Sequence, residues 1–290
     1  MFEGSGVALV TPFRDGKIDE SALVALIEAQ IAGGTQVLVP CGTTGESATL
    51  SHEEHDRVID ITVSAAKGRV KVLAGAGSNS TEEAIRLTQH AKKSGADGAL
   101  HICPYYNRPT QEGLYRHFES VAKATGFPIV LYNIPGRTSV NMLPKTVARL
   151  AKIDNIVGIK EASSVAQVSE LIELCPPDFA VLSGEDALTF PMLALGAKGA
   201  ISVTANLLPK ACAEMFAAVG RGDWLTARKI HYELAEMNRI LFIETNPAPT
   251  KAALALMKKM LPDVRLPLVA LSPESLDQLQ KTLKSYHLLG

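Results

Sequence analysis

The chain of 290 residues contains only four cysteines, no excess of charge of either sign and no long hydrophobic run. Its 29 Lys and Arg residues are scattered among 30 Asp and Glu, giving a net charge of -1, so the basic surface that nucleic acid requires is not expected. Nowhere do the roughly 18 consecutive apolar residues of a membrane helix occur. The first residues also lack the basic and apolar regions of a signal peptide. We therefore expect a soluble cytoplasmic protein that binds neither membranes nor nucleic acid.

The cysteines and histidines argue against metal sites and disulfide bonds. The four cysteines lie far apart, without the close pairs of a zinc site or the density of a disulfide framework, so we expect four reduced thiols. Cys41 adjoins a glycine-rich loop and is expected to be a buried structural cysteine. His52 and His55 are one residue short of the H-E-x-x-H zinc pattern, which predicts no catalytic metal. They are expected to mark a solvated helix start, with a ligand site as the alternative.

Short apolar runs alternate with amphipathic stretches over most of the chain. Ser51 with Glu54, and Ser80 with Glu83, have the spacing of capping boxes and predict two helix starts. The predicted strands are 6–10, 37–39, 70–74, 99–103, 129–133, 156–160, 180–183 and 200–203. The predicted helices after them are 19–32, the two opened by Ser51 and Ser80, 111–125, 143–152, 165–174, 187–195 and 209–220. Together they make eight successive βα units.

Eight βα units in about 220 residues predict an α/β fold, a (β/α)8 TIM barrel over residues 1–223. A doubly wound open sheet is the alternative. Against its dinucleotide-binding form, residues 75–80 read Gly-Ala-Gly-Ser-Asn-Ser, with serine where the third glycine of the fingerprint belongs. After residue 223 the alternation stops, and 224–241, 248–260 and 273–288 are predicted as helices separated by prolines. We expect residues 224–290 to form a helical C-terminal domain.

The strand that ends at Lys160 places an ammonium group at the end of a run that is otherwise typical of a buried strand. Burial disfavours the charged form of an amine, and a neutral amine can attack a ketone to form a Schiff base. The alternative is a lysine whose head reaches out into water.

Other polar residues gather at the carboxyl ends of the predicted strands, where barrels of this kind carry their active sites. Gly42 to Glu46 brings two hydroxyls and two glycines to a turn suited to an anion, although a tight turn without a ligand has the same pattern. Tyr132 could move protons near Lys160, or be a core tyrosine. Arg137 is suited to a carboxylate, or lies on the surface. What favours the functional interpretation is that Lys160, Tyr132 and Thr43 fall at the same end of the barrel.

At this point the motifs resemble a known family. Gly42-Thr43-Thr44-Gly45-Glu46-Ser47, the 104–109 run Pro-Tyr-Tyr-Asn-Arg-Pro, the 132–138 run Tyr-Asn-Ile-Pro-Gly-Arg-Thr, Gly-Ile-Lys-Glu-Ala at 158–162 and Asn246-Pro247-x-Pro249-x-Lys251 resemble the dihydrodipicolinate synthase (4-hydroxy-tetrahydrodipicolinate synthase) family. The match spans nearly the whole chain, and the family belongs to the N-acetylneuraminate lyase or class I pyruvate aldolase superfamily. Gly136 departs from the pattern, because serine is common before the arginine.

The resemblance implies an enzyme, a Schiff-base-forming lyase of lysine and diaminopimelate biosynthesis. It would be a homotetramer of tight dimers that condenses pyruvate with L-aspartate 4-semialdehyde and needs no separate cofactor. The implied catalytic residues are Lys160, Tyr132, Thr43 and Tyr106, the last from the neighbouring subunit. The implied substrate-binding residues are Thr44, Arg137, Ile201 and Gly184. Positions that match the family's site for inhibitory L-lysine are Ser47, Ala48, Leu50, His52, His55, Asn79, Glu83 and Tyr105.

Three other functions stay open at this stage. The first is another Schiff-base pyruvate aldolase, such as N-acetylneuraminate lyase or a sugar-acid aldolase, which the aldehyde consumed with pyruvate would distinguish. The second is a catalytically silent barrel, against which the retention of Lys160, Tyr132, Thr43 and Arg137 speaks. The third is a phosphate-binding flavin barrel, for which 202–206 and its neighbouring glycines form only a weak candidate phosphate cup.

Overall fold

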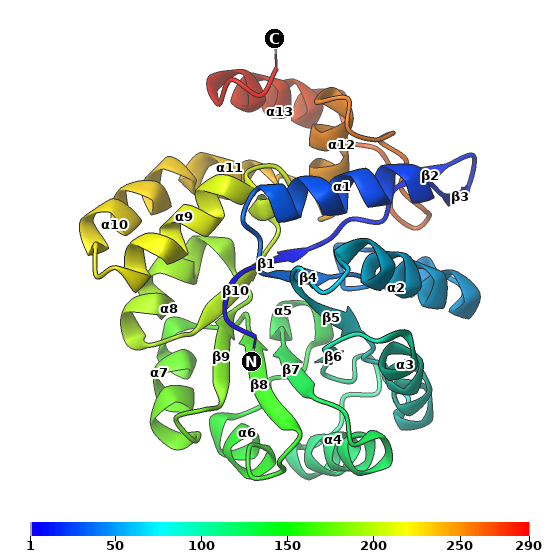
Figure 1. Cartoon of the computed structure of the whole chain (residues 1–290), viewed down its shortest axis with the longest axis vertical. Coiled ribbons are helices and arrows are strands. Elements are labelled where there is room, and N and C mark those ends of the chain that lie inside the picture. The colour runs from blue at the N-terminus through cyan, green and yellow to red at the C-terminus, as the bar shows by residue number, and fades with distance from the viewer. Residues whose placement is uncertain (1, 290) are drawn as a thin grey trace.

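The short apolar runs of the sequence form eight parallel strands that close into a barrel (Figure 1). The computed structural model describes residues 2–289. The strands are β1 (Gly4–Ala8), β4 (Val37–Val39), β5 (Lys71–Gly75), β6 (Gly98–Ile102), β7 (Ile129–Asn133), β8 (Ile156–Glu161), β9 (Ala180–Ser183) and β10 (Gly199–Ser202). Neighbouring strands follow the chain around the ring, and β1 pairs with β10 to close it. The predicted (β/α)8 architecture is confirmed.

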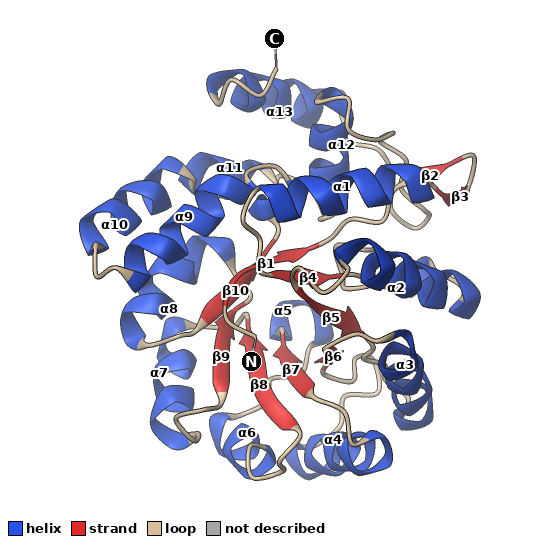
Figure 2. Cartoon of the chain, viewed as in Figure 1, coloured by secondary structure: helices blue, strands red, loops and turns tan. Residues whose placement is uncertain are grey.

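Helices surround this barrel on its outer side, as Figure 2 shows. The main helices that follow the eight strands in turn are α1 (Glu20–Ala32), α2 (His52–Ala66), α3 (Thr81–Ser94), α4 (Gln111–Thr125), α6 (Pro144–Leu150), α7 (Val165–Leu174), α8 (Thr189–Leu195) and α9 (Pro209–Gly220). Short helical turns lie in the loops, namely η1 (Ser47–Thr49), α5 (Pro135–Thr138), η2 (Asp186–Leu188) and η3 (Thr204–Asn206). No helix of residues 2–289 is long and apolar enough to cross a membrane.

Several boundaries differ from the sequence-based expectations. The first strand lies two residues earlier than predicted, and the hairpin of β2 (Phe13–Arg14) and β3 (Lys17–Ile18) was not predicted. The capping box of Ser51 and Glu54 is complete. The Ser80 side chain also caps its helix, but Glu83 does not return the bond, because its carboxylate contacts Ser78 and His52 instead.

The inside of the barrel is a packed apolar core and not a channel. Its side chains come from alternate positions of the strands and include Val37, Val39, Leu73, Leu100, Val130, Leu182 and Ile201, all buried. Two larger apolar clusters fill the space between the strands and the surrounding helices. Because the interior is filled, chemistry has room only at the barrel mouth.

The residues after the barrel form four further helices. They are α10 (Trp224–Glu233), α11 (Ala235–Ile240), α12 (Ala248–Leu256) and α13 (Pro273–Ser285). The single predicted helix 224–241 is therefore two helices that meet at Leu234. Helices α11, α12 and α13 share an apolar cluster that also takes in Val10 and Leu26 of the barrel. The C-terminal helices are present, while the domain boundary at residue 223 stays a prediction.

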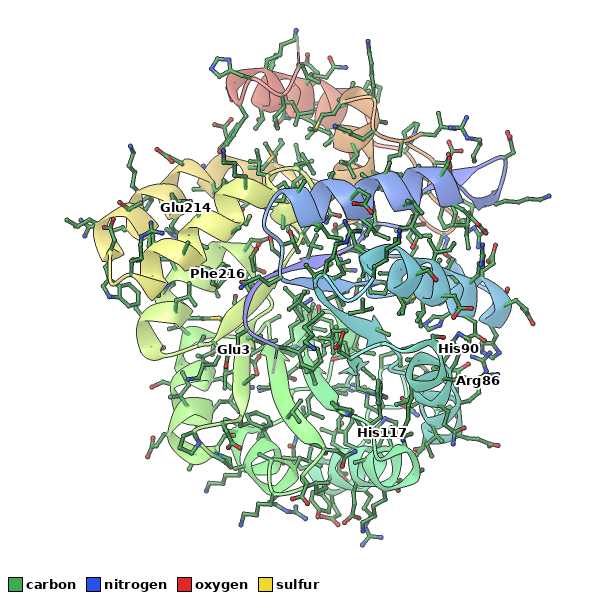
Figure 3. All side chains as sticks on the ribbon, viewed as in Figure 1. Glu3, Arg86, His90, His117, Glu214 and Phe216 are labelled. Atoms are coloured by element: carbon green, nitrogen blue, oxygen red, sulfur yellow. The ribbon has the colours of Figure 1, made fainter. Side chains whose placement is uncertain are left out.

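Two histidines are buried without charge in the layer between β6, α3 and α4. His101 Nε2 lies 2.9 Å from the hydroxyl oxygen of Thr88, which itself donates to the Ala84 carbonyl, so Nε2 carries the proton and Nδ1 has no partner among the described residues. His117, labelled on α4 in Figure 3, contacts Thr81 through Nδ1 and likewise leaves Nε2 without a partner. Burial lowers the pKa of His101 from 6.5 to about 3 and that of His117 to about 4.

Acid should therefore destabilise the fold. Below pH 6.5 the unfolded chain binds a proton at each histidine that the folded chain excludes, so stability falls as the pH drops towards the folded-state pKa values. The slope is about 1.4 kcal/mol per pH unit for each histidine in that window. We expect His101→Gln to flatten the pH dependence of the free energy of unfolding between pH 6.5 and 4.5, measured by urea denaturation. The exposed His287→Gln is the control, and an equal slope in all three proteins would contradict this account.

Candidate active site

Lys160 lies at the barrel mouth with its amine enclosed. Lys160 pairs in register with Tyr132 across strands β7 and β8. Both side chains point inward, and the exposed fraction is 6% for Lys160 and 5% for Tyr132. Lys160 Nζ lies 4.1 Å from the centre of the Tyr132 ring, a cation–π distance. The alternative, a lysine whose head reaches out into water, is therefore wrong, because the Tyr132 ring and the segment after β9 cover the amine.

Gly184, directly after β9, leaves the room that the Lys160 side chain occupies. A Cβ atom at Gly184 would lie only 3.0 Å from Cγ and Cε of Lys160. The backbone there is held by a hydrogen bond from Gly184 N to the Glu161 carbonyl at 2.7 Å. The next residue, Glu185, has its pKa raised first by burial and then by the charge of Asp186, while the charge of Lys160 opposes the shift. The absence of a side chain at Gly184 thus leaves space for the Lys160 side chain.

The loop Gly42–Glu46 is a compact turn at the end of β4. Gly45 N donates to the Gly42 carbonyl at 3.0 Å, and Glu46 N donates to the Thr43 carbonyl at 3.1 Å. The Thr44 hydroxyl oxygen accepts a hydrogen bond from Asn246 Nδ2 at 2.9 Å, so its own proton is free to be donated. Thr44 is buried, whereas Thr43 is only half-buried. The loop therefore offers hydroxyl donors to an anion.

A cavity of about 440 Å³ opens beside this loop. Thr43 and Arg137 line it, and Arg137 is fixed by a hydrogen bond from Nη2 to the Asn246 carbonyl at 3.2 Å. Most of the positions predicted for L-lysine also line it, namely Ser47, Ala48, Leu50, His52, His55, Glu83 and Tyr105. Lys160, Tyr132, Thr44, Gly184, Ile201 and Asn79 are not among its lining residues. One continuous cavity thus extends from the loop Gly42–Glu46 and Arg137 to the residues of helices α2 and α3, which we call the α2–α3 side of the cavity.

The α2–α3 side of the cavity carries the Glu83 carboxylate beside His52. His52 Nε2 lies 2.8 Å from Glu83 Oε1, and hydrogen bonds from Ser78 and His52 lower the pKa of Glu83. His55 differs from the predicted solvated helix start, because α2 packs it inward, with burial lowering its pKa to about 4. Its Nδ1 has no hydrogen-bond partner among the described residues. Asn79 Nδ2 donates to the Tyr105 carbonyl at 3.3 Å.

Tyr106 stands apart from the other predicted catalytic residues. It is 91% exposed, and its backbone φ of 65° lies in the left-handed region. Among residues 2–289, the hydroxyl of Tyr132 makes no hydrogen bond to Thr43 or Tyr106. The predicted proton relay is therefore not assembled within one chain, and its members stay predictions.

The candidate phosphate cup is occupied by the protein itself. Asp186 Oδ2 accepts hydrogen bonds from the backbone amides of Val203 and Thr204 at 2.9 and 3.0 Å. These are the donors that a phosphate at this end of the barrel would need. A carboxylate in their place argues against the flavin-barrel alternative.

The four cysteines are free thiols, and burial raises the pKa of Cys41, as expected for a structural cysteine. In residues 2–289, no three His, Cys, Asp or Glu side chains are grouped so that they could hold a metal ion.

Sequence reasoning missed a buried carboxylate directly after the lysine. Glu161 accepts hydrogen bonds from Asn133 Nδ2 at 3.0 and 3.1 Å, Gln167 Nε2 at 2.9 Å and Ser163 N at 2.8 Å. Asn133 and Glu161 are register partners one position beyond Tyr132 and Lys160. The network thus ties together the two strands that carry the amine and the phenol. Its only sequence signal was the motif that contains Glu161.

Comparison with known proteins agrees with this geometry. The model of the dihydrodipicolinate synthetase family matches residues 1–286. A relative from Syntrophus aciditrophicus (strain SB), 4-hydroxy-tetrahydrodipicolinate synthase, is 57% identical over 291 residues, which cover 100% of both chains. The crystal structure of dihydrodipicolinate synthase from Aquifex aeolicus is 49% identical, with a TM-score of 0.98 and 99% of each chain covered.

Two other solved relatives contain small molecules. The dihydrodipicolinate synthase from Acinetobacter baumannii, complexed with pyruvate, is 45% identical, with a TM-score of 0.97 and 100% of each chain covered. The enzyme from Cyanidioschyzon merolae, with lysine bound, is 40% identical, with a TM-score of 0.96 and 99% of each chain covered. With a family model that matches nearly every residue and relatives that align from end to end, the chain belongs to the dihydrodipicolinate synthetase family.

Proposed function

We propose that this protein is a lyase that condenses pyruvate with L-aspartate 4-semialdehyde, as a 4-hydroxy-tetrahydrodipicolinate synthase of lysine and diaminopimelate biosynthesis. The observation that carries the proposal is the amine of Lys160, enclosed at the barrel mouth and placed 4.1 Å from the centre of the Tyr132 ring. The relatives named for this activity align over the whole chain. N-acetylneuraminate lyase and sugar-acid aldolases share the lysine chemistry, but the names of these relatives do not favour them.

The reaction begins at the lysine. The neutral amine of Lys160 adds to the ketone carbon of pyruvate, and water leaves to give a protonated imine. The imine withdraws electrons, so a methyl proton departs and an enamine forms. The enamine carbon attacks the aldehyde of the second substrate. The amine of that substrate then adds to the imine carbon, displaces Lys160 and closes the six-membered ring, so the enzyme needs no separate electron sink.

The surrounding residues divide the remaining tasks. Tyr132 would move protons between the imine and solvent through Thr43 and the partner subunit's Tyr106. Thr44 donates its free hydroxyl proton to the carboxylate of pyruvate, because Asn246 already occupies its oxygen. Gly184 and the backbone at Ile201 complete the pyruvate site. Arg137 lines the cavity beside Thr43 and would hold the carboxylate of the semialdehyde.

We propose that the chain assembles as a homotetramer of tight dimers, in which Tyr106 reaches the active site of the neighbouring chain. Tyr106 is 91% exposed in one chain, so its phenol is free to contact a second chain. Sedimentation together with activity, measured over a dilution series, tests this arrangement. A fully active monomer would show that the site is complete in a single chain.

Reductive trapping tests the Schiff base directly. Borohydride with pyruvate should add one three-carbon acid per chain, at Lys160, because only the imine is reduced to a stable secondary amine. Peptide mapping by mass spectrometry locates the label. Arg137→Ala is the matched variant: it should be trapped normally while the KM for the semialdehyde rises, since pyruvate does not depend on Arg137. Labelling at another lysine, or none, would refute the proposed chemistry.

We propose further that L-lysine binds on the α2–α3 side of the cavity as a feedback inhibitor. Glu83, held as a carboxylate by its hydrogen bonds, can pair with an ammonium group, and His52 and His55 line the same space. Asn79 and Tyr105 can bind the carboxylate of the ligand. Tyr105 precedes Tyr106, so binding can alter the proposed relay without competing with pyruvate.

Calorimetric titration with L-lysine tests this second site. We expect binding that Glu83→Gln weakens, and a modest coupling to turnover of about 1–3 kcal/mol. Rates should fall at saturating pyruvate. No heat of binding at millimolar lysine, or inhibition that pyruvate overcomes completely, would exclude a separate regulatory site.

A further inference from the structure

A fully buried ion pair joins the C-terminal domain to the loop Gly42–Glu46. Lys251 Nζ, on α12, lies 2.6 Å from Glu46 Oε1, and the two side chains are 0% and 1% exposed. The residues are 205 positions apart in the sequence. Glu46 lines the cavity beside Thr43, whereas Lys251 does not, and both oxygens of the Glu46 carboxylate are already bound by Lys251 and Arg265. The pair therefore has no assigned role in the chemistry.

The groups around the pair leave little freedom to either charge. Two cationic groups lie over the Phe13 ring: Lys251 Nζ is 4.1 Å and Arg265 Cζ is 4.2 Å from the ring centre. Arg265 N donates to the second oxygen of Glu46 at 3.0 Å, and the Arg265 guanidinium is held by both oxygens of Glu54 at 2.6 Å. Burial lowers the pKa of Lys251, and the charge and hydrogen bond of Glu46 oppose this shift. The Glu46 carboxylate is thus bound from two sides.

The same carboxylate belongs to a residue with an uncommon backbone conformation. Glu46 has a φ of 54°, in the left-handed region that side chains other than glycine rarely adopt. It ends the loop that carries Thr43 and Thr44. Asn246, five residues before Lys251, adds a second buried link by donating Nδ2 to the Thr44 hydroxyl at 2.9 Å. Two side chains of the C-terminal domain therefore hold this loop from outside the barrel.

A buried ion pair is a weak source of stability, because desolvation of the two charges offsets most of their attraction. Its directional contacts, in contrast, define one arrangement of the atoms it joins. We propose that Lys251 and Asn246 of the C-terminal domain are positioning residues, which hold the loop Gly42–Glu46 in the conformation that binds pyruvate. The inference rests on the proposed pyruvate chemistry and adds the C-terminal domain to it.

The test compares Lys251→Met, the double variant Glu46→Gln with Lys251→Met, and Lys259→Met. Lys259 is exposed on the same segment and serves as the matched control. The single variant leaves Glu46 buried without its partner, so it should lower Tm and raise the KM for pyruvate at least tenfold. The double variant removes both charges. It should regain most of the lost Tm while the KM for pyruvate stays raised, with kcat at saturating pyruvate within about threefold of the parent. Lys259→Met should match the parent in both measurements.

A double variant with restored Tm and a parental KM for pyruvate would overturn the proposal, because the pair would then only join the two domains. The same holds for a stable Lys251→Met protein with an unchanged KM. If neither variant folds, Asn246→Ala tests the second link. A rise of the KM for pyruvate by less than threefold then counts against positioning, and a rise of threefold or more supports it. Trapping of pyruvate by the parent protein is measured first, so a failure of the Schiff-base chemistry is recognised separately.

Discussion

Lys160→Ala is expected to abolish nearly all turnover while the protein remains folded. The substitution removes the amine that lies against Tyr132 at the barrel mouth, so the imine cannot form and the rate should fall by at least roughly a thousandfold. The barrel core lies below this residue, and the truncated side chain leaves space that water can enter from the mouth. Steady-state rates with both substrates, together with circular dichroism and Tm, check the two parts of the expectation.

The exposed Lys152→Ala, just before β8, is the matched control for Lys160→Ala and should keep parental turnover and labelling. The Lys160 variant should also resist reductive labelling by pyruvate. If Lys160→Ala kept more than a tenth of the parental rate, the nucleophile would have to be another group. If it failed to fold, Lys160→Met, which keeps the apolar stem, would separate the loss of chemistry from the loss of packing.

Tyr132→Phe is expected to keep the aromatic ring beneath the amine and remove only the hydroxyl. The ring contact at 4.1 Å should therefore survive, and the effect should appear in proton transfer. We expect kcat to fall roughly a hundredfold, the usual scale for the loss of a positioned proton donor or acceptor. Stopped-flow measurement of imine formation should show a slowed step with pyruvate alone.

The pH–rate profile gives the decisive comparison for Tyr132. Loss of a proton relay should change the shape of the kcat profile, whereas loss of packing alone should scale the whole curve. An unchanged kcat would make Tyr132 a packing residue. The related substitution Tyr106→Phe should reproduce the loss only where the subunits associate, because the proposed relay takes that phenol from the partner.

Local patterns in the sequence were sufficient for the barrel and for the burial of its candidate nucleophile, Lys160. The helix predicted near 111–125 spans Gln111–Thr125, and the capping box at Ser51 is formed as expected, because both depend on neighbouring positions. Strand order followed from the number of βα units. Lys160 was identified because a charge at the end of an apolar run is unusual, and β8 buries it as the run predicted.

What the sequence could not show depends on residues that are far apart. The link from Asn246 to Thr44 spans 202 positions, and no periodicity connects the two. The burial of His55 was missed because a helix start is usually solvated, whereas here α2 packs its first turn inward. The hairpin that brings Phe13 to Lys251 has strands of only two residues each. Such strands are too short to show an alternation of apolar and polar residues. The hydrogen bond, the burial of His55 and the hairpin all depend on tertiary packing.

Gly184 has a consequence for any attempt to change which aldehyde the enzyme accepts. Because a methyl group there would lie only 3.0 Å from Cε of Lys160 and from Cβ of Ala162, any side chain at residue 184 requires the lysine to shift. The open volume lies instead beside the loop after β4 and the loop after β7, where Thr43 and Arg137 line the cavity. Libraries for altered specificity should therefore randomise the loops after β4 and β7 and keep residue 184 constant.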